Sequence, residues 1–249
     1  MTKVITLVNE KGGVGKTTST INLGAALRLQ GQKVLLVDFD TQGSLTKYLG
    51  YEPKELEPQH RTIIFALTGQ ANISDIIIKG DIDLIASSKE TGRQNLSSVL
   101  VLREVLATLG DRYDFILIDS PPVAEHLIAV ALAAADEVLI PVEPDYLSIA
   151  GTGDLLETIE ETRRNFNPNL KTLGILPTKA FMHHNNDKQY IEELYKLKEM
   201  NIPVFKPIPF STKFRQAANL GKSAVELFPS FSGSERYNAI ANYIINNHD

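Results

Sequence analysis

The chain has 249 residues, of which 43% are hydrophobic and 22% are charged, an ordinary composition for a globular protein. It contains no cysteine, which excludes disulfides, thiolate metal sites, iron–sulfur ligation and cysteine nucleophiles. The formal net charge is −5, so any binding to nucleic acid must come from a local basic patch. No apolar run approaches the roughly 18 residues that span a bilayer, and no signal-like segment is visible. We therefore expect a soluble cytoplasmic protein.

Short apolar segments rich in β-branched residues alternate with helix-like segments along the chain. The predicted strands are residues 4–8, 33–40, 83–86, 115–119, 137–142, 172–177 and 203–209. The predicted helices are residues 17–31, 97–110, 124–135, 146–166, 187–200 and 235–247, and residues 50–62 are predicted to be a loop. This alternation predicts an α/β fold with a doubly wound, mostly parallel sheet flanked by helices. We expect one domain over residues 1–249.

A glycine-rich turn follows the first predicted strand. Residues Val8 to Thr18 read VNEKGGVGKTT and nearly match the pattern G-x-x-x-x-G-K-[ST], with Glu10 where the first glycine would stand. Glycines let backbone N–H groups converge on phosphate oxygens, and the following helix N-terminus adds partial positive charge. Lys16 can reach the β- and γ-phosphates, and the Thr17 hydroxyl can bind Mg²⁺. The predicted phosphate-binding residues are Gly12, Gly13, Val14, Gly15, Lys16, Thr17 and Thr18.

The segment K-G-G-V-G-K-T-T resembles the deviant Walker A motif of the ParA/MinD family of ATPases. In that family the early lysine, here Lys11, reaches across a dimer interface to the partner's nucleotide. Residues 33–46 resemble the family's D-x-D-P-Q-G-N motif, with Thr41 in place of proline, and residues 113–122 resemble its Walker B strand. Residues 135–151 also resemble the family, so the resemblance runs from residue 3 to about 245. It implies a P-loop NTPase fold, ATP and Mg²⁺ as cofactors, and slow basal ATP hydrolysis.

Three aspartates follow predicted strands at positions that match these motifs. Asp38 and Asp40 close a strand beside the P-loop strand, and Asp119 ends the Walker B-like strand. Phosphoryl transfer to water depends on positioning the water and neutralising charge, so carboxylates are needed here. The resemblance implies that Asp40 orients water, while Asp38 supports the metal or the loop. It thus implies a catalytic set of Lys11, Lys16 and Asp40, and a metal set of Thr17, Asp38 and Asp119.

The later part of the chain holds weaker candidates. By resemblance, Thr178 and Pro209 lie near the nucleotide base. Residues 207–229 resemble a family segment near the DNA-facing surface, but Phe210 replaces its first arginine. The predicted DNA contacts are Lys206, Lys213, Arg215 and Lys222. Adjacent His183 and His184 have no third histidine at ligand spacing, so we interpret them as a surface loop.

Three functions within the family remain open. The first is a ParA/Soj-type partition ATPase, which forms an ATP sandwich dimer, binds non-specific DNA and is released when a ParB-like partner stimulates hydrolysis. The chain begins at the P-loop strand, so it resembles the short form without an N-terminal helix-turn-helix. The second is a ParA-like ATPase that positions a protein cargo, such as a carboxysome or a chemoreceptor cluster, on the nucleoid. The third is a MinD-type ATPase that cycles on and off a membrane.

The C-terminal segment argues against the membrane-cycling alternative. A MinD-type tail is a basic amphipathic helix, whereas SERYNAIANYIINNHD carries one basic residue, Arg236, and ends in the polar residues 246–249. We therefore predict a cytoplasmic, nucleoid-associated homodimer that segregates plasmid or chromosomal DNA and does not bind membranes.

Overall fold

The computed structural model describes residues 1–247, apart from the side chains of Ile149, Ala150 and Met200. His248 and Asp249, the end of the polar tail, lie outside the described residues. The strands are β1 (Lys3–Leu7), β2 (Val34–Asp38), β3 (Asp83–Ile85), β4 (Phe115–Asp119), β5 (Glu137–Val142) and β6 (Lys171–Pro177).

The six strands form one sheet in the order β3-β2-β4-β1-β5-β6, and every pair of neighbours is parallel. All residues of β2 and β4 are buried, because helices cover both faces of the sheet. The predicted α/β fold with a doubly wound, mostly parallel sheet is therefore confirmed.

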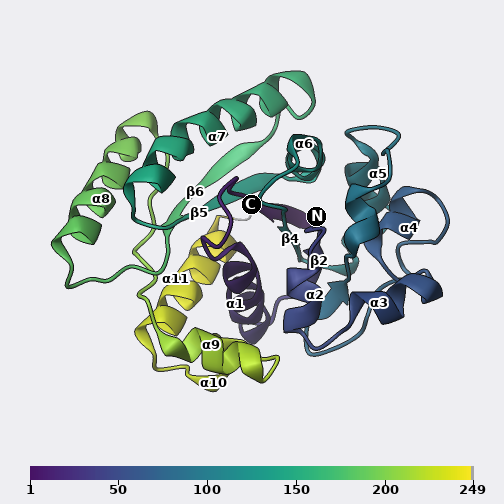
Figure 1. Ribbon diagram of the computed structural model, residues 1–249, viewed down its shortest axis with the longest axis horizontal. Helices are drawn as coiled ribbons and strands as arrows, with labels where there is room; N and C mark the ends of the chain where they lie inside the picture. The colour runs from purple at the N-terminus through teal and green to yellow at the C-terminus, as the bar shows by residue number, and fades with distance from the viewer. Residues whose placement is uncertain (248–249) are drawn as a thin grey trace.

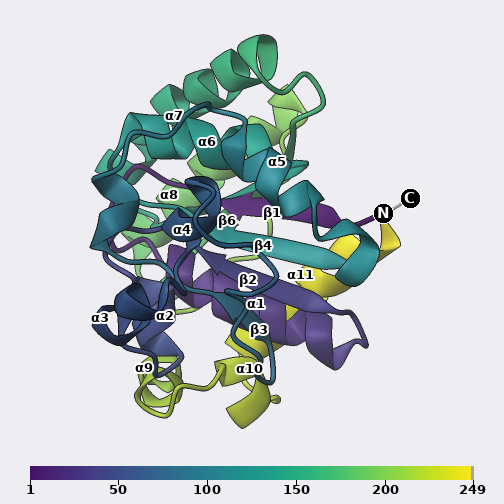
Figure 2. The ribbon, with the colours of Figure 1, turned by 90° about the vertical axis from the view of Figure 1, so that its right-hand side faces the viewer.

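The helices form two layers around this sheet. Figures 1 and 2 show α1 (Lys16–Leu29) and α11 (Ser232–Asn246) on one side of the sheet, and α6 (Glu125–Ala134) and α7 (Tyr146–Asn165) on the other. Apolar side chains of α1 and α11 pack with the sheet into one core cluster, and those of α6 are divided between two further clusters, one of which also includes side chains of α7. The remaining helices are α2 (Ser44–Tyr48), α3 (Pro53–Leu56), α4 (Ile63–Leu67), α5 (Val101–Ala107), α8 (Asn185–Lys196), α9 (Thr212–Asn219) and α10 (Ala224–Leu227).

Two predicted segments differ from the structure. The predicted strand at residues 203–209 makes only two isolated parallel bridges, Val204 to Ile175 and Pro209 to Ala180. Its three prolines, at 203, 207 and 209, have no N–H to donate to a ladder. The predicted loop at residues 50–62 contains α3, which begins at Pro53, followed by a 3₁₀ turn at residues 57–59.

The strand order places the candidate site. Because neighbouring strands are parallel, the carboxyl ends of β1, β2, β4 and β5 lie at one edge of the sheet. The strand order reverses at β1, which lies between β4 and β5. Ligands of open α/β sheets bind at that edge, where the strand order reverses. Within residues 1–247, no helix is both long enough and apolar enough to cross a membrane.

Candidate nucleotide site

The turn between β1 and α1 has the backbone of a phosphate-binding loop. Gly13 and Gly15 adopt positive φ angles of 79° and 92°, a region that disfavours residues with a Cβ. Gly15 is the N-cap of α1, and no side chain caps this helix end. The N–H groups of the first turn therefore remain free for an anion, which the helix dipole also favours.

Lys16 lies buried inside this loop. Its Nζ donates to the carbonyl oxygens of Asn9, at 2.8 Å, and Lys11, at 3.2 Å. Burial lowers the pKa of Lys16, while the charges of Asp119 and Asp40 oppose that shift. The ammonium group is thus held by two backbone carbonyls that β- and γ-phosphates can replace.

Thr17 and Asp119 meet beside Lys16. The Thr17 hydroxyl donates to Asp119 Oδ2 at 2.7 Å, and Asp119 Oδ1 is buried without a hydrogen-bond partner among the described residues. An orphaned carboxylate oxygen next to a hydroxyl is a donor set that suits Mg²⁺, which prefers oxygen ligands and keeps several waters. These two residues therefore fit the magnesium ion that the sequence predicts.

The other two aspartates organise the segment after β2. Asp38 Oδ2 accepts from the Thr46 backbone N at 2.8 Å and from the Thr46 hydroxyl at 2.7 Å, while Asp38 Oδ1 accepts from the Asp40 N at 3.1 Å. Asp40 Oδ1 accepts from the Gln42 N at 3.1 Å. Both oxygens of Asp38 are engaged, so of its two predicted roles the geometry favours support of the loop.

Asp38 and Asp119 are the last residues of the neighbouring strands β2 and β4, where they are paired in register. Burial raises the pKa of Asp38 to about 7. Burial, together with the nearby charge of Asp38, raises the pKa of Asp119 to about 8. The folded protein without metal therefore disfavours full ionisation of this pair, whereas a bound cation would favour it.

We expect this pair to make the metal-free protein less stable as the pH rises from about 4 towards 8. Both pKa values exceed the ordinary value of 3.8, so the folded chain binds more protons than the unfolded chain in this window and the free energy of unfolding falls with rising pH. Thermal melting in EDTA at about pH 6 and pH 8.5 measures the slope. Asp119→Asn should reduce the slope, whereas Asp111→Asn, which changes an 85% exposed carboxylate, should not. Equal slopes for wild type and Asp119→Asn would contradict the assignment.

Lys11 does not share the position of Lys16. Its Nζ donates to Asp145 Oδ2 at 2.7 Å and to Ser148 Oγ at 2.9 Å, both at the start of α7. Asp145 also caps α7, because its Oδ1 accepts from the Ser148 N at 3.0 Å. Although burial alone raises the pKa of Asp145, hydrogen bonds from Lys11 and Ser148 hold this pKa below its ordinary value.

The partner residues of Lys11 are functional candidates that sequence reasoning missed. The spacing of Asp145 and Ser148 is a recognisable N-cap signal, but nothing in it indicates a contact with a lysine 134 positions away. The loop after β1, which carries Lys11, meets the loop after β5, which carries Asp145, because β1 and β5 are neighbours in the sheet.

A cavity of about 590 Å³ adjoins the P-loop. Thr178 and Pro209, the two predicted base contacts, both line it, as do Gly15 and Thr18. The Thr178 hydroxyl donates to the Val14 carbonyl oxygen at 2.6 Å, which ties this cavity to the P-loop. The structure therefore brings the predicted phosphate and base residues together.

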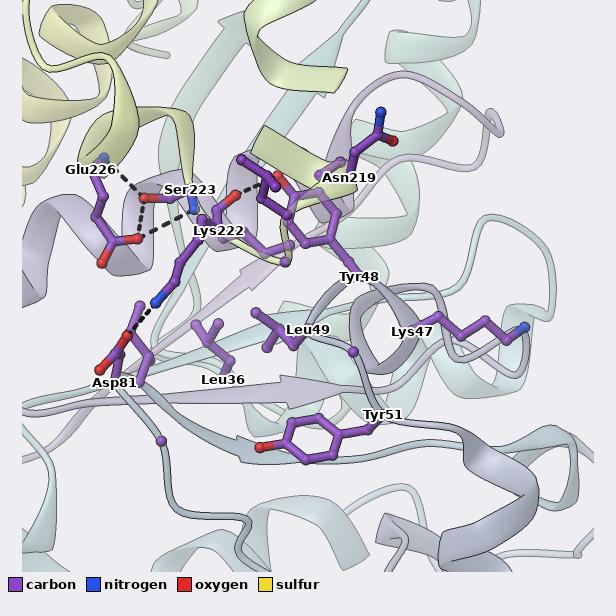
Figure 3. A pocket seen from close by; sticks show the side chains of 17 residues that line it. Leu36, Lys47, Tyr48, Leu49, Tyr51, Asp81, Asn219, Lys222, Ser223 and Glu226 are labelled. Carbon is purple, nitrogen blue, oxygen red and sulfur yellow. Dashed lines mark hydrogen bonds and ion pairs between the residues drawn. The ribbon is translucent and has the colours of Figure 1, made fainter. Parts of the chain in front are cut away.

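The four predicted DNA contacts are not gathered into one free basic surface. Figure 3 shows Lys222 reaching to Asp81 beside a cavity of about 520 Å³, with Nζ 2.7 Å from Asp81 Oδ2. The Nζ of Lys213 lies 4.9 Å from the centre of the Phe231 ring. Arg215 and Lys206 are exposed. His183 and His184 lie in the turn before α8, and the described residues contain no group of three or more His, Asp or Glu side chains placed to hold a metal.

A parallel sheet with a glycine loop, a buried loop lysine and a threonine–aspartate pair defines a P-loop nucleotide-binding protein. The AAA domain family matches residues 2–172. The chain is 34% identical over 257 residues to the sporulation initiation inhibitor protein Soj of Bacillus subtilis, covering 99% of this chain and 100% of that protein. It is 34% identical over 243 residues to the chromosome-partitioning ATPase Soj of Thermus thermophilus, covering 97% and 94%.

Among solved structures, cobyrinic acid a,c-diamide synthase of Mycobacterium smegmatis with bound ADP and magnesium has a TM-score of 0.85 at 29% identity. The match covers 100% of this chain and 96% of that chain. The chain therefore belongs to the ParA/MinD family of deviant Walker A ATPases, and the predictions of an ATPase with ATP and Mg²⁺ as its cofactors are confirmed.

Proposed function

We propose that this chain is a partition ATPase of the ParA/Soj type, which dimerises around ATP, binds non-specific DNA and is released when a ParB-like partner stimulates hydrolysis. The observation that carries the proposal is that two lysines of one loop take different positions and bind different partners. Lys16 lies in the phosphate site of its own chain, whereas Lys11 is held outside it by Asp145. A second loop lysine is unnecessary for a site completed by one chain, which supports a site that two chains complete.

The proposed roles follow from the contacts. Lys16 and the free N–H groups of α1 bind the phosphates. Thr17 and Asp119 would hold Mg²⁺, which would supply positive charge to offset the negative charge of the transferred phosphoryl group. The charge of Asp40 raises the pKa of Lys16, against the larger effect of burial, and Asp40 Oδ1 accepts from the Gln42 N. Asp40 orients the attacking water, and Asp38 fixes the loop that carries it. Slow basal hydrolysis follows if a partner must complete this arrangement.

The proposed binding to DNA has support separate from that of the nucleotide site. It rests on the relatives' role in chromosome partitioning and on the exposed cations Lys206 and Arg215. The Lys222–Asp81 pair is also half-exposed, and such pairs are weak enough for a phosphate to compete for the lysine.

The test is binding of the full chain to random duplex DNA and to anionic vesicles, each with ATP and with ADP, at two salt concentrations. ATP-dependent binding to DNA that weakens with salt supports the proposal, because phosphate contacts release counterions. Binding to vesicles instead of DNA would favour the MinD-type alternative and overturn the DNA part. Binding to neither surface would leave the ATPase without the proposed partition role.

Asp40→Ala is expected to trap the ATP-bound dimer. The substitution removes the carboxylate that orients water but none of the groups that bind phosphates, so hydrolysis should fall about 100-fold or more while ATP still binds. Size-exclusion chromatography with ATP should show a persistent dimer. Ser44→Ala is the control, because it removes only a weak 3.4 Å contact of its Oγ with Asp40 Oδ2. Normal turnover by Asp40→Ala would remove this residue from the mechanism.

A further inference from the structure

An exposed aromatic stack stands at the cavity beside the P-loop. Phe210 lines this cavity and is 48% exposed. Its ring stacks on Phe181, with centroids 4.6 Å apart and planes 22° apart, and Phe181 stacks in turn on His184 at 5.0 Å and 10°. Three flat rings therefore lie in series, and the first borders the space next to Gly15 and Thr18.

The position of Phe210 is fixed by backbone hydrogen bonds. The Phe210 N donates to the Ala180 carbonyl oxygen at 3.0 Å, and the Ala180 N donates to the Ile208 carbonyl oxygen at 3.0 Å. The Phe181 N donates to Asp187 Oδ2 at 2.7 Å, which anchors the second ring to α8. The stack is thus prearranged by the bridge between residue 180 and residue 209.

The other aromatic residues of this cavity have structural partners. Phe214 packs edge-on against Tyr237 at 6.1 Å, and the Tyr237 hydroxyl is hydrogen-bonded to Ser19. The Tyr48 hydroxyl donates to the Lys222 carbonyl oxygen at 3.0 Å; Tyr48 also lines the neighbouring cavity drawn in Figure 3. Phe210 differs because its ring is half-exposed at the cavity.

We propose that Phe210 stacks on the base of the bound nucleotide, backed by Phe181, and makes the site prefer purine over pyrimidine nucleotides. This inference rests on the proposed nucleotide site. A purine offers a larger aromatic face than a pyrimidine, and stacking of aromatic rings adds to the burial of their area. The location also fits: the cavity of about 590 Å³ begins at the P-loop glycine that caps α1, so a nucleotide with phosphates on α1 projects its base towards it.

The experiment is calorimetric titration of the full chain with Mg²⁺ and, separately, ADP, CDP and inorganic tripolyphosphate. Wild type should bind ADP more tightly than CDP. Phe210→Ala should weaken ADP binding about tenfold, weaken CDP binding less, and leave tripolyphosphate binding unchanged. Phe210→Trp should keep the preference for ADP, whereas Phe210→Leu, which keeps apolar volume without a flat ring, should lose most of it. Phe166→Ala is the control, because Phe166 is 42% exposed at the end of α7.

The outcomes separate this inference from the nucleotide site itself. If Phe210→Ala and Phe210→Leu bind ADP within about twofold of wild type, the stacking role is wrong while the phosphate site stands. If wild type binds neither ADP nor tripolyphosphate, the proposed nucleotide site fails and the inference fails with it. If both variants lose ADP and tripolyphosphate equally, Phe210 supports the fold of the site and the stacking role is again wrong.

Discussion

Lys16→Ala should abolish measurable ATP turnover. The Lys16 ammonium is buried, and in the described structure its hydrogen bonds go to two backbone carbonyl oxygens. Burial lowers its pKa, and the nearby charges of Asp119 and Asp40 oppose that shift. In the proposed site, removing the ammonium takes away the positive charge that would offset the charge of the β- and γ-phosphates. Loss of one such preorganised donor costs about 10²- to 10³-fold in turnover, and nucleotide affinity should fall as well. Steady-state phosphate release and titration with ADP measure the two effects.

The matched control for this prediction is Lys47→Ala. Lys47 is exposed and its Nζ bonds the Gln42 carbonyl oxygen, so it lies near the Asp40 loop without entering the phosphate site. Turnover of this variant should stay within about threefold of wild type, as expected for an exposed side chain. Retention of ATPase activity by Lys16→Ala would show that the P-loop has been assigned wrongly.

The parallel sheet and the phosphate site are visible in the sequence because their signals are local. Glycines between a predicted strand and a predicted helix indicate a phosphate-binding loop, and Asp119 is recognisable because it ends an apolar strand. The apolar composition of residues 203–209 predicts a strand, but their three prolines lack the N–H groups that a strand ladder needs, and only two isolated bridges form.

The contacts that sequence reasoning did not find join segments far apart in the chain. The Phe181–Phe210 stack spans 29 positions, and the Lys222–Asp81 pair spans 141. The occupation of both Asp38 oxygens by Thr46 and the Asp40 N could not be read from a motif that marks only the aspartates. Such pairings depend on strand order and loop packing, which no single motif encodes.

Lys11→Ala should prevent the ATP dimer while leaving binding of nucleotide to the monomer largely intact. Among the described residues, the Lys11 ammonium hydrogen-bonds Asp145 and Ser148 rather than Asp119 or Thr17. If it contacts the partner's nucleotide in the dimer, its loss should raise the dimer dissociation constant by about 30-fold or more, the usual effect of deleting one partner of a buried charge pair. Sedimentation with ATP measures the dimer, and titration with ADP measures the monomer site. Full dimerisation of Lys11→Ala would refute the role across the interface.

Asp145→Asn tests the same idea in the opposite direction. To reach a partner, Lys11 must leave Asp145, and their side chains are 39% and 37% exposed, so the ion pair contributes at most about 1 kcal/mol. Asparagine can still accept from the Ser148 N and cap α7, but it no longer holds the lysine by charge. Because a dimer must break two such pairs, Asp145→Asn should tighten the ATP dimer by about three- to tenfold. Double substitution with Lys11→Ala should erase that gain, since only a released Lys11 can produce it. If the dimer of the double variant is still tightened relative to that of Lys11→Ala alone, the effect of Asp145→Asn comes from a change in α7 and not from release of Lys11.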